Sequence, residues 1–337
     1  MAAVFCFGEL LLRLSPLLNG SWIQTASMPV YVGGAELNVA RALSKWEVPV
    51  SYGTVLPGNY LSEEIIEFLA TENIDTRSIL LSGNRIGTYY LPQGADLKNA
   101  GVIYDREHSA FYDLKPGQID WDEVLQGKQW FHFSAISPSL NAQLALVCKE
   151  GVQAATSKGL TVSVDLNYRS KLWQWGKTPV EVMPELLPYC DVVMGNIWAA
   201  EKMLGIELHV NLADNKENYL AAAEKTAIAI CCKYPKCKQV ANTFRFDQPD
   251  GGLHYYATLF KDNHTTVSRM HQTKRVIDKV GSGDCFMAGL IYGNIKKYST
   301  QDIIDFAAAA AFNKLFIKGD ATTSTVEEIK NCNLNYA

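Results

Sequence analysis

The 337-residue sequence has little charge imbalance and lacks a long apolar run. Its formal net charge is −4, so no strongly basic surface is expected to attract nucleic acid or an anionic membrane. No apolar stretch in the chain reaches the roughly 20 residues that a membrane-spanning helix needs. We therefore expect neither nucleic acid nor membrane as a partner, and any anionic ligand has to be held by local charges.

Recognisable metal motifs and a secretory signal are also missing. The 6 histidines form no His-x-His or His-Glu-x-x-His pattern. Cys231, Cys232 and Cys237 lie close together among the 8 cysteines, but no second cluster or histidine completes a zinc site. The N-terminus has no basic segment, and Glu9 interrupts its apolar run. We therefore predict free thiols in a reducing cytoplasm and assign no metal-ligating residues.

Two common phosphate-binding motifs are absent as well. The chain contains no G-x-x-x-x-G-K-[ST] stretch, which excludes a P-loop enzyme by sequence. No G-x-G-x-x-G follows the first apolar segment, so a nucleotide-dependent oxidoreductase has no motif in its support. A phosphate site in this chain therefore needs another arrangement of main-chain and side-chain donors.

What the sequence does contain, from residue 128 onward, is an alternation of short apolar segments with amphipathic ones. This alternation predicts βαβ units and a mainly parallel sheet covered by helices on both faces, an α/β fold. A run of alanines at 307–311 predicts a further helix buried on several faces. The predicted strands are Trp130–Ser134, Leu160–Asp165, Asp191–Gly195 and Gln239–Thr243, and the predicted helices are Asn141–Ser157, Val180–Leu187, one from Trp198, and Lys216–Cys232.

Two segments, roughly 12–32 and 85–113, do not follow this alternation. They contain short β-prone stretches such as Val30–Val32, Thr88–Leu91 and Val102–Tyr104. We predict that these stretches form a small antiparallel sheet that acts as a lid over the ligand edge, with an exposed face suited to a homodimer or a higher homo-oligomer. The remainder forms the core, so residues 1–337 are expected to be one domain.

Polar residues stand at or just past the ends of the predicted strands. Ser134, Asp165 with Asn167, Asn196 and Thr243 all occupy such positions. Ligands bind at the carboxyl ends of the strands in open α/β sheets. Each residue alone is better explained as the N-cap of the next helix. Their agreement on one edge favours a ligand site there.

The stretch Val276–Gly289 is the most informative part of the sequence. Gly281 and Gly283 flank Ser282, Asp284 comes next, and a predicted helix then runs to about Lys297. Glycines before a helix let backbone N–H groups converge on an anion, and the helix start adds positive charge. Such a site suits a transferring phosphoryl group, and a carboxylate beside it can take the proton of an attacking hydroxyl. An ordinary glycine-rich turn explains the same residues equally well.

The residues 278–284, Asp-Lys-Val-Gly-Ser-Gly-Asp, resemble the C-terminal signature D-T-x-G-A-G-D of the PfkB family of carbohydrate kinases. Residues 33–43 resemble its N-terminal Gly-Gly signature, so the resemblance spans nearly the whole chain. It implies a ribokinase-like three-layer αβα core with a β-sheet lid, and ATP with Mg²⁺ as cofactors; dependence on a monovalent cation stays open. It also implies a catalytic set in which Gly281, Ser282 and Gly283 form an anion hole and Asp284 is the base.

The stretches around Arg106 and Arg169 resemble those of 2-keto-3-deoxygluconate kinases, with Y-x-R in the lid and D-x-N-x-R-x-x-L-W in the core. A guanidinium can hold a carboxylate bidentately, which a neutral sugar does not require. The resemblance implies phosphorylation of 2-keto-3-deoxygluconate to its 6-phosphate. The implied substrate-binding residues are Gly33, Gly34, Asn38, Tyr90, Tyr104, Arg106, Arg169, Asp284 and Asp320. The candidates on the nucleotide side are Asn167, Arg169, Asn196, Thr243, Arg245, Gly281 and Gly283, although Arg245 fits a solvated loop equally well.

One position departs from the family pattern. The family usually carries N-x-x-E after a core strand, and its glutamate helps to organise the Mg²⁺ water shell, whereas this chain has Ala199 after Asn196. Glu201 would lie about 200° further round a helix and is no obvious substitute. Two alternatives therefore stay open. One is a fructokinase or another sugar kinase of the family. The other is a catalytically weakened sugar-binding regulatory protein, which the intact Gly-Ser-Gly-Asp stretch opposes.

Overall fold

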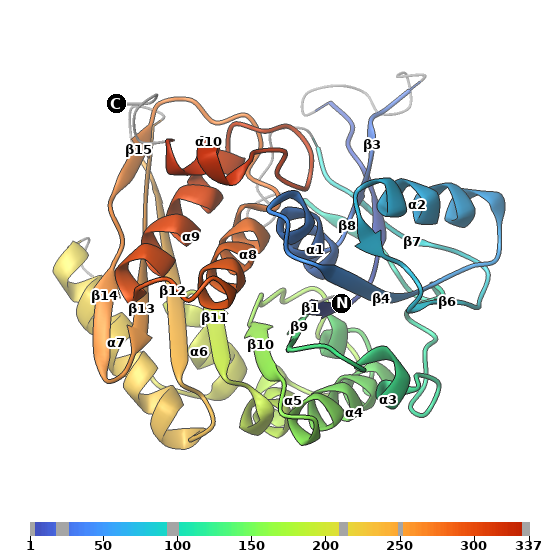
Figure 1. The fold of residues 1–337 in the computed structure, drawn as a ribbon, viewed down its shortest axis with the longest axis horizontal. Coiled ribbons are helices and arrows are strands. Elements are labelled where there is room, and N and C mark those ends of the chain that lie inside the picture. Colours follow the sequence, from blue (N-terminus) through green and yellow to red (C-terminus); the bar gives the residue numbers. More distant parts are fainter. Residues whose placement is uncertain (1–3, 18–26, 93–100, 209–214, 249–251, 332–337) are drawn as a thin grey trace.

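The computed structural model describes residues 4–17, 27–92, 101–208, 215–248 and 252–331, and its strands and helices alternate through the core (Figure 1). The strands are β1 (Val4–Phe7), β2 (Leu11–Leu14), β3 (Val30–Gly33), β4 (Val50–Leu56), β5 (Ile74–Asp75), β6 (Ile79–Leu81), β7 (Gly87–Tyr90), β8 (Ile103–Asp105), β9 (Trp130–Ser134), β10 (Thr161–Asp165), β11 (Val192–Gly195), β12 (Gln239–Asp247), β13 (Leu253–Lys261), β14 (His264–Val267) and β15 (His271–Thr273). The helices are α1 (Ala35–Lys45), α2 (Tyr60–Thr71), α3 (Trp121–Val124), α4 (Ala142–Ser157), α5 (Pro179–Leu186), α6 (Ile197–Leu204), α7 (Lys216–Lys233), α8 (Ser282–Ile295), α9 (Thr300–Lys314) and α10 (Val326–Lys330).

Most of the strands belong to one large sheet, with 11 strands among the described residues. Its main path runs β14-β13-β12-β11-β10-β9-β1-β4-β5, and its pairs from β12 to β5 are parallel. The pairs β12–β13 and β13–β14 are antiparallel and form one edge of the sheet. The mainly parallel sheet predicted from the sequence is therefore confirmed. Strand β12 continues past Thr243, where the sequence pattern had placed its end, because it pairs with β13 along its whole length.

Helices cover both faces of this sheet and make it the middle of three layers (Figure 1). One apolar cluster joins the sheet to α1, α2, α8, α9 and α10, and a second cluster joins the opposite face to α3, α4, α5, α6 and α7. Strands buried on both faces explain why the strand segments are almost continuously apolar. The predicted three-layer αβα core is therefore confirmed. Within the described ranges, none of the helices combines the length and the apolar character needed to cross a membrane.

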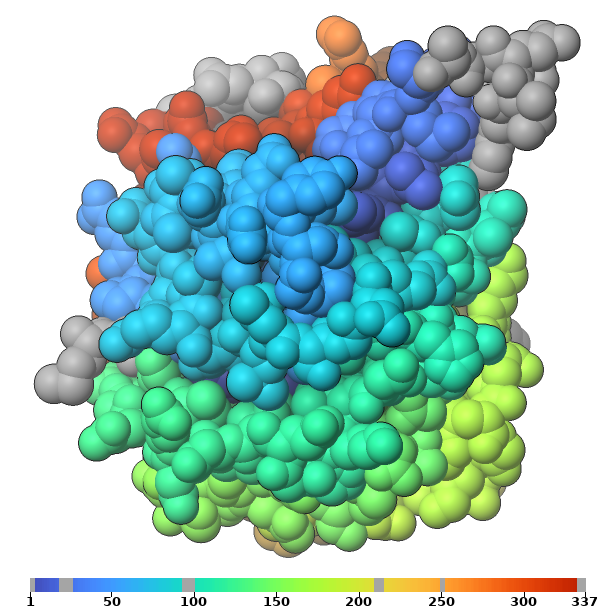
Figure 2. All heavy atoms as spheres, turned by 90° about the vertical axis from the view of Figure 1, so that its right-hand side faces the viewer, coloured from blue at the N-terminus to red at the C-terminus, as the bar shows by residue number. Residues whose placement is uncertain are grey.

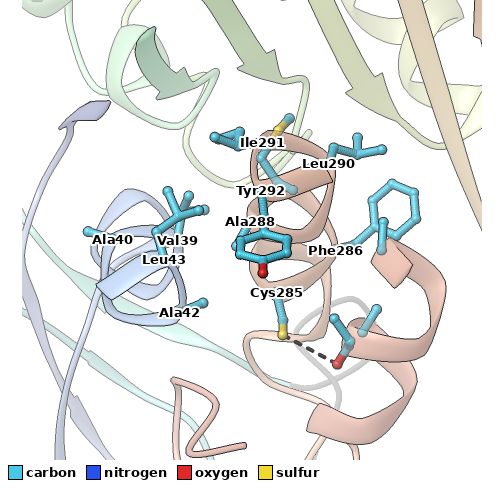
Figure 3. Packing of buried hydrophobic residues seen from close by; sticks show 14 of the residues in the cluster. Val39, Ala40, Ala42, Leu43, Cys285, Phe286, Ala288, Leu290, Ile291 and Tyr292 are labelled. Atoms are coloured by element: carbon cyan, nitrogen blue, oxygen red, sulfur yellow. Dashed lines mark hydrogen bonds between the residues drawn. The ribbon is translucent and has the colours of Figure 1, made fainter. Parts of the chain in front are cut away.

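Helix α8 is buried on nearly every side and lies between α1 and α9 (Figure 3). Val39 and Leu43 of α1 point toward it, and Cys285 Sγ donates a hydrogen bond of 3.3 Å to the carbonyl oxygen of Ala310 in α9. Gly289 allows the close approach, because a Cβ there would lie 2.6 Å from the Cα of Ala307. This packing fixes the start of α8, which carries Asp284, against α1.

The predicted lid is a separate sheet, in which the described residues form 4 strands in the order β3-β2-β7-β8. Strands β2 and β7 run parallel, so the expectation of a purely antiparallel lid is wrong; only β2–β3 and β7–β8 are antiparallel. Residues 18–26 and 93–100 of the predicted lid segments lie outside the described part of the chain. Opposed residues across the strands form two rows on opposite faces: Tyr31, Arg13, Tyr89 and Tyr104 on one, and Val30, Leu14, Tyr90 and Ile103 on the other.

The first half of the chain, from blue to green, covers most of the side of the molecule that Figure 2 presents, and red residues of the C-terminal part lie along its top. The side chains of α2 and of the segments that follow it pack there without a break into the green residues of α3 and α4. Cysteines of the described ranges are free thiols, and most of them are buried.

Candidate active site

Two cavities meet at Asp284. The larger is a groove of about 270 Å³ at the carboxyl ends of β10, β11 and β12. The smaller has a volume of about 70 Å³ and lies between the lid sheet, α1 and the start of α8. Asn167, Arg169 and Asp284 line both cavities. Ligands bound in the two cavities would therefore face the same carboxylate.

The start of α8 presents backbone N–H groups to the groove. Its N-cap is Gly281, with φ 77°, and no side chain caps this end of the helix. The first N–H groups of a helix have no partner within it, and Ser282 and Gly283 both line the groove. A Cβ on Gly281 would lie 1.8 Å from the carbonyl oxygen of Asp320, so only glycine fits there. The predicted anion-binding turn thus has the geometry of an open helix N-terminus.

The pKa of Asp284 is raised to about 8, chiefly by burial and also by the neighbouring Asp165 and Glu36 carboxylates. A hydrogen bond of 2.7 Å, donated by Asn38 Nδ2 to Asp284 Oδ2, opposes the rise, as does the Arg169 charge. A carboxylate that titrates near neutral pH is suited to accept a proton from an alcohol. Asn38 thus holds the carboxylate at the point where the two cavities join.

Glu36, a second buried carboxyl group, was not among the predicted site residues. Burial raises its pKa to about 7, although Ser134 donates two hydrogen bonds to Oε1, from N at 2.8 Å and from Oγ at 2.6 Å. Ser134 ends strand β9 as predicted, but it is fully buried and lines neither cavity. Glu36 instead adds negative charge beneath Asp284. Its position two residues after the predicted Gly33-Gly34 pair was the available signal.

The wall of the small cavity combines the lid with the start of α1. Tyr89 and Tyr104 line it from the lid, and Gly34 and Asn38 line it from the other side. Tyr90 is not part of this wall, because consecutive residues of a strand point to opposite faces and Tyr90 lies in the other row. Tyr89, one residue earlier, therefore occupies the place in the cavity wall that was predicted for Tyr90.

Arg106 also lines the small cavity, where it forms a buried ion pair with Glu9. Its Nε and Nη2 lie 2.6 Å and 2.5 Å from Glu9 Oε2, and Ser109 Oγ donates to Glu9 Oε1 at 2.5 Å. One edge of the guanidinium, made up of Nε and Nη2, is therefore engaged by the protein. This revises the expectation of a free bidentate clamp. Glu9 was missed, although a charged residue so soon after the buried strand β1 was a signal.

Asn167 and Arg169 lie in the loop after β10, where the two cavities join. The backbone N of Asn167 donates to Asp165 Oδ1 at 3.0 Å, which fixes the first turn of the loop. Arg169 is half-buried, and its Nη1 donates to the carbonyl oxygen of Tyr168 at 3.1 Å. This arrangement agrees with the predicted position of both residues between the two ligands.

The far wall of the groove contains Asn196, Thr243 and Arg245. Asn196 also caps α6, because its Oδ1 accepts a hydrogen bond from the backbone N of Ala199 at 2.8 Å. The capping explanation and the predicted place at the ligand edge therefore hold together for this residue. Arg245 lies within β12 and not in a loop. Lys279 was not predicted, but it lines the groove beside the glycine turn. Its Nζ lies 3.0 Å from Asp247 Oδ1.

The groove can accept a phosphate-bound Mg²⁺ ion. Among the described residues, no group of three or more His, Cys, Asp or Glu side chains could hold a metal without other ligands. Mg²⁺ at nucleotide sites is bound mainly by phosphate and water oxygens with one or two carboxylates, and Asp165 supplies a carboxylate in the wall. Ala199, which stands where the family usually has a glutamate, offers no metal ligand in the groove wall. Glu201 is not part of that wall, and its Oε2 lies 3.7 Å from Lys202 Nζ.

Gly33 and Asp320 take a different part from the one predicted. A Cβ on Gly33 would lie 2.3 Å from Asp320 Oδ2, so the glycine makes room for this carboxylate and not for a ligand. Asp320 is buried and accepts hydrogen bonds from Arg13 Nε at 2.7 Å and from Tyr89 OH at 3.1 Å. It lies among the residues behind the glycine turn and outside the walls of the two cavities.

Comparisons with known proteins agree with this geometry. The family described as pfkB family carbohydrate kinase matches residues 1–325. A 2-dehydro-3-deoxygalactonokinase from Haloferax volcanii is 28% identical over 330 residues, which cover 98% of this chain and 96% of the relative. The crystal structure of 2-dehydro-3-deoxygluconokinase from Thermotoga maritima matches with a TM-score of 0.89 and 37% identity, over 98% of this chain and 99% of that one. The fold of a fructokinase with bound ATP from Xylella fastidiosa matches with a TM-score of 0.74 at 18% identity, over 98% of each chain.

Proposed function

Because the chain belongs to the pfkB family of carbohydrate kinases, we propose that it transfers the γ-phosphoryl group of ATP to the 6-hydroxyl of 2-keto-3-deoxygluconate. This acceptor is the 2-dehydro-3-deoxygluconate in the name of the Thermotoga maritima relative. The observation that carries the proposal is the position of Asp284, whose carboxylate lines both cavities and lies beside the open N-terminus of α8.

ATP occupies the groove in this proposal. The groove has the larger volume and ends at the first turn of α8, where backbone N–H groups favour phosphate. Arg245 and Lys279 add positive charge to its walls, and Asn196 and Thr243 offer polar contacts. The fructokinase from Xylella fastidiosa that shares this fold was solved with ATP bound, which supports nucleotide binding in the family.

The sugar acid occupies the small cavity. Arg106 and Arg169 are its cationic residues, and Tyr89 and Tyr104 line it on the lid side. The carboxylate of the acceptor is placed against the arginines, because a charge-assisted hydrogen bond is stronger than one between neutral groups. The 6-hydroxyl at the other end of the acceptor then points to Asp284.

The transfer follows from this placement. The hydroxyl oxygen attacks the γ-phosphorus, the bond from that phosphorus to the β–γ bridging oxygen breaks, and ADP leaves. Asp284 takes the hydroxyl proton, while the N–H groups at the start of α8 stabilise the charge on the transferring oxygens. Asp165 would help to hold a phosphate-bound Mg²⁺ ion, which would supply positive charge against the phosphates. The lid sheet keeps water, a competing acceptor, away from the small cavity.

The outer face of the lid sheet serves as a homodimer contact in this proposal. Val30 and Ile103 lie in the row opposite to the cavity and are 53% and 52% exposed. Apolar side chains on such a face are suited to pair with a second copy. In sedimentation experiments, the double substitution V30E/I103E is expected to convert a dimer into a monomer. A wild-type chain that sediments as a monomer would rule out this contact.

A substrate panel tests the proposed reaction. ADP release is measured with 2-keto-3-deoxygluconate, its C4 epimer 2-keto-3-deoxygalactonate, fructose and ribose, and the phosphorylated position is found by NMR. We expect kcat/KM for the keto acid to exceed that for fructose by about 100-fold, because a neutral sugar cannot accept the charge-assisted hydrogen bonds that the arginines offer to a carboxylate. Preference for fructose or ribose would refute the sugar-acid assignment, and no turnover with any acceptor would favour a sugar-binding regulatory protein. Preference for the epimer would move the assignment to the activity in the name of the Haloferax volcanii relative.

A further inference from the structure

Four charged residues are buried together behind the glycine turn, and none of them belongs to the walls of the two cavities. Arg13, Asp278, Lys314 and Asp320 are exposed by only 2%, 7%, 0% and 3%. Burying a charge is costly unless an opposite charge and hydrogen bonds compensate it. The two cations and the two carboxylates of this cluster compensate one another's charge. The cluster is therefore a fixed part of the structure, and it lies beside the site.

Arg13 connects the two carboxylates from the lid side. It lies on β2, its Nε donates to Asp320 Oδ1 at 2.7 Å, and its Nη2 lies 3.1 Å from Asp278 Oδ2. The guanidinium also lies over the ring of Tyr31 in β3, 4.3 Å from the ring centre. Its planar fork suits this bridge, whereas a lysine ammonium is a single point of charge. One lid residue thus holds two core segments together.

Both of these segments support the glycine turn directly. Asp278 Oδ1 accepts a hydrogen bond from the backbone N of Val280 at 3.0 Å, and Asp278 Oδ2 accepts one from the backbone N of Gly319 at 3.1 Å. The carbonyl oxygen of Asp320 lies against Gly281. A shift of either carboxylate would therefore move the N–H groups that begin α8.

The same cluster also sets one wall of the small cavity. Tyr89 donates its hydroxyl to Asp320 Oδ2 at 3.1 Å, and its ring lines the cavity. Arg13 and Tyr89 are opposed residues in neighbouring lid strands. The position of the lid and the position of the glycine turn are therefore coupled through Asp320.

We propose that Arg13 is a positioning residue that aligns the phosphate-binding turn with the acceptor cavity by holding Asp278 and Asp320 from the lid sheet. This proposal rests on the kinase function proposed above. Lys314 cannot replace Arg13, because its Nζ is already bound to the carbonyl oxygen of Ile317 at 2.9 Å. Without Arg13, two buried carboxylates share one cation, and the turn shifts to separate them.

Three variants test the role of Arg13. R13M removes the charge but keeps an apolar stem, R13K keeps one charge without the fork, and R13M/D320N removes one charge of each sign. We expect R13M to lower kcat by about 100-fold, as loss of anion-hole alignment does, while the Kd of a non-hydrolysable ATP analogue stays within about threefold. R13M/D320N is expected to recover about tenfold in kcat over R13M, because charge balance returns.

R41M is the matched control. Arg41 also forms a two-bond ion pair, with Glu72, through contacts of 2.6 Å each, and it lies outside both cavity walls. Its loss is expected to lower the melting temperature without changing kcat. The positioning role is refuted if the loss of activity in R13M is no greater than the loss of folded protein that binds the ATP analogue. It is also refuted if R13M/D320N recovers no activity over R13M. Should R13M fail to fold, R13K decides: a kcat about tenfold below wild type supports the role, and a wild-type kcat overturns it.

Hydrogen exchange separates this proposal from the proposed function. The amides of residues 278–284 are expected to exchange about tenfold faster in R13M than in wild type, and at wild-type rates in R41M. This readout needs no substrate. If the wild-type chain phosphorylates none of the acceptors but R13M still loosens this segment, the proposed reaction fails while the coupling stands. Unchanged exchange in a folded R13M would overturn the coupling itself.

Discussion

The groove and the small cavity are built in different ways, although they share Asp284. The groove is lined mainly by residues at the ends of β10, β11 and β12, which follow one another along the chain. The small cavity combines the lid strands with the starts of α1 and α8, which are far apart in the sequence. The order of the strands in the large sheet therefore brings the residues of the groove together. The small cavity depends in addition on the contacts that hold the lid sheet against the core.

The largest expected effect comes from the residue that both cavities share. D284N keeps the shape of the side chain and its contact with Asn38 but removes the proton acceptor. We expect kcat to fall by about 1000-fold, while binding of the ATP analogue and of the acceptor changes by less than about threefold. Single-turnover kinetics and titration calorimetry measure these quantities. A D284N enzyme within tenfold of wild type would remove Asp284 from the proton transfer.

A substitution at Arg106 should affect the acceptor side alone. R106A alone would leave the Glu9 carboxylate buried without its cation. Both variants therefore carry E9Q, and the kinetics of R106A/E9Q are compared with those of E9Q. The KM for the sugar acid is expected to rise by about 30-fold through loss of a charge-assisted hydrogen bond, and the KM for ATP to change by less than about twofold. Initial-rate kinetics with each substrate varied in turn provide the test. An equal rise in both KM values would show that the two cavities do not bind separate ligands.

The smallest expected effect is a dependence of stability on pH. The pKa of Asp284 is raised by burial from an ordinary value of 3.8 to about 8, so the folded state holds a proton that the unfolded chain has lost. The stability from this proton is complete below pH 3.8 and is lost as pH rises through about 8. D284N has no such titration, so its melting temperature relative to wild type should rise by about 2 °C or more between pH 5 and pH 9. A constant difference would mean that Asp284 is already ionised at pH 5.

The same contrast explains which parts of the site could be predicted from the sequence. Asn196 and Thr243 follow from strand ends, and Gly281 to Asp284 follow from the pattern of a glycine turn before a helix. The pattern predicted the strands and helices between Trp130 and Cys232 to within a few residues because buried parallel strands and amphipathic helices have distinct periods. The family resemblance added the assignment of a base and an anion hole to that pattern.

The lid side could not be predicted in the same detail. The choice between Tyr89 and Tyr90 depends on strand register, because a shift of one residue reverses the face. The engagement of Arg106 by Glu9 and of Asp320 by Arg13 depends on tertiary contacts between distant segments. Sequence patterns identify charged residues near a site but do not say whether those charges face a ligand or one another.

A crystal structure of the wild-type chain with 2-keto-3-deoxygluconate and a non-hydrolysable ATP analogue tests the central claim most directly. We expect the 6-hydroxyl at a hydrogen-bonding distance of about 2.6–3.2 Å from the Asp284 carboxylate, with the γ-phosphate at the N–H groups of the glycine turn. The acceptor carboxylate should lie against Arg106 and Arg169. An acceptor bound elsewhere, or an Asp284 side chain turned away from both ligands, would contradict the account.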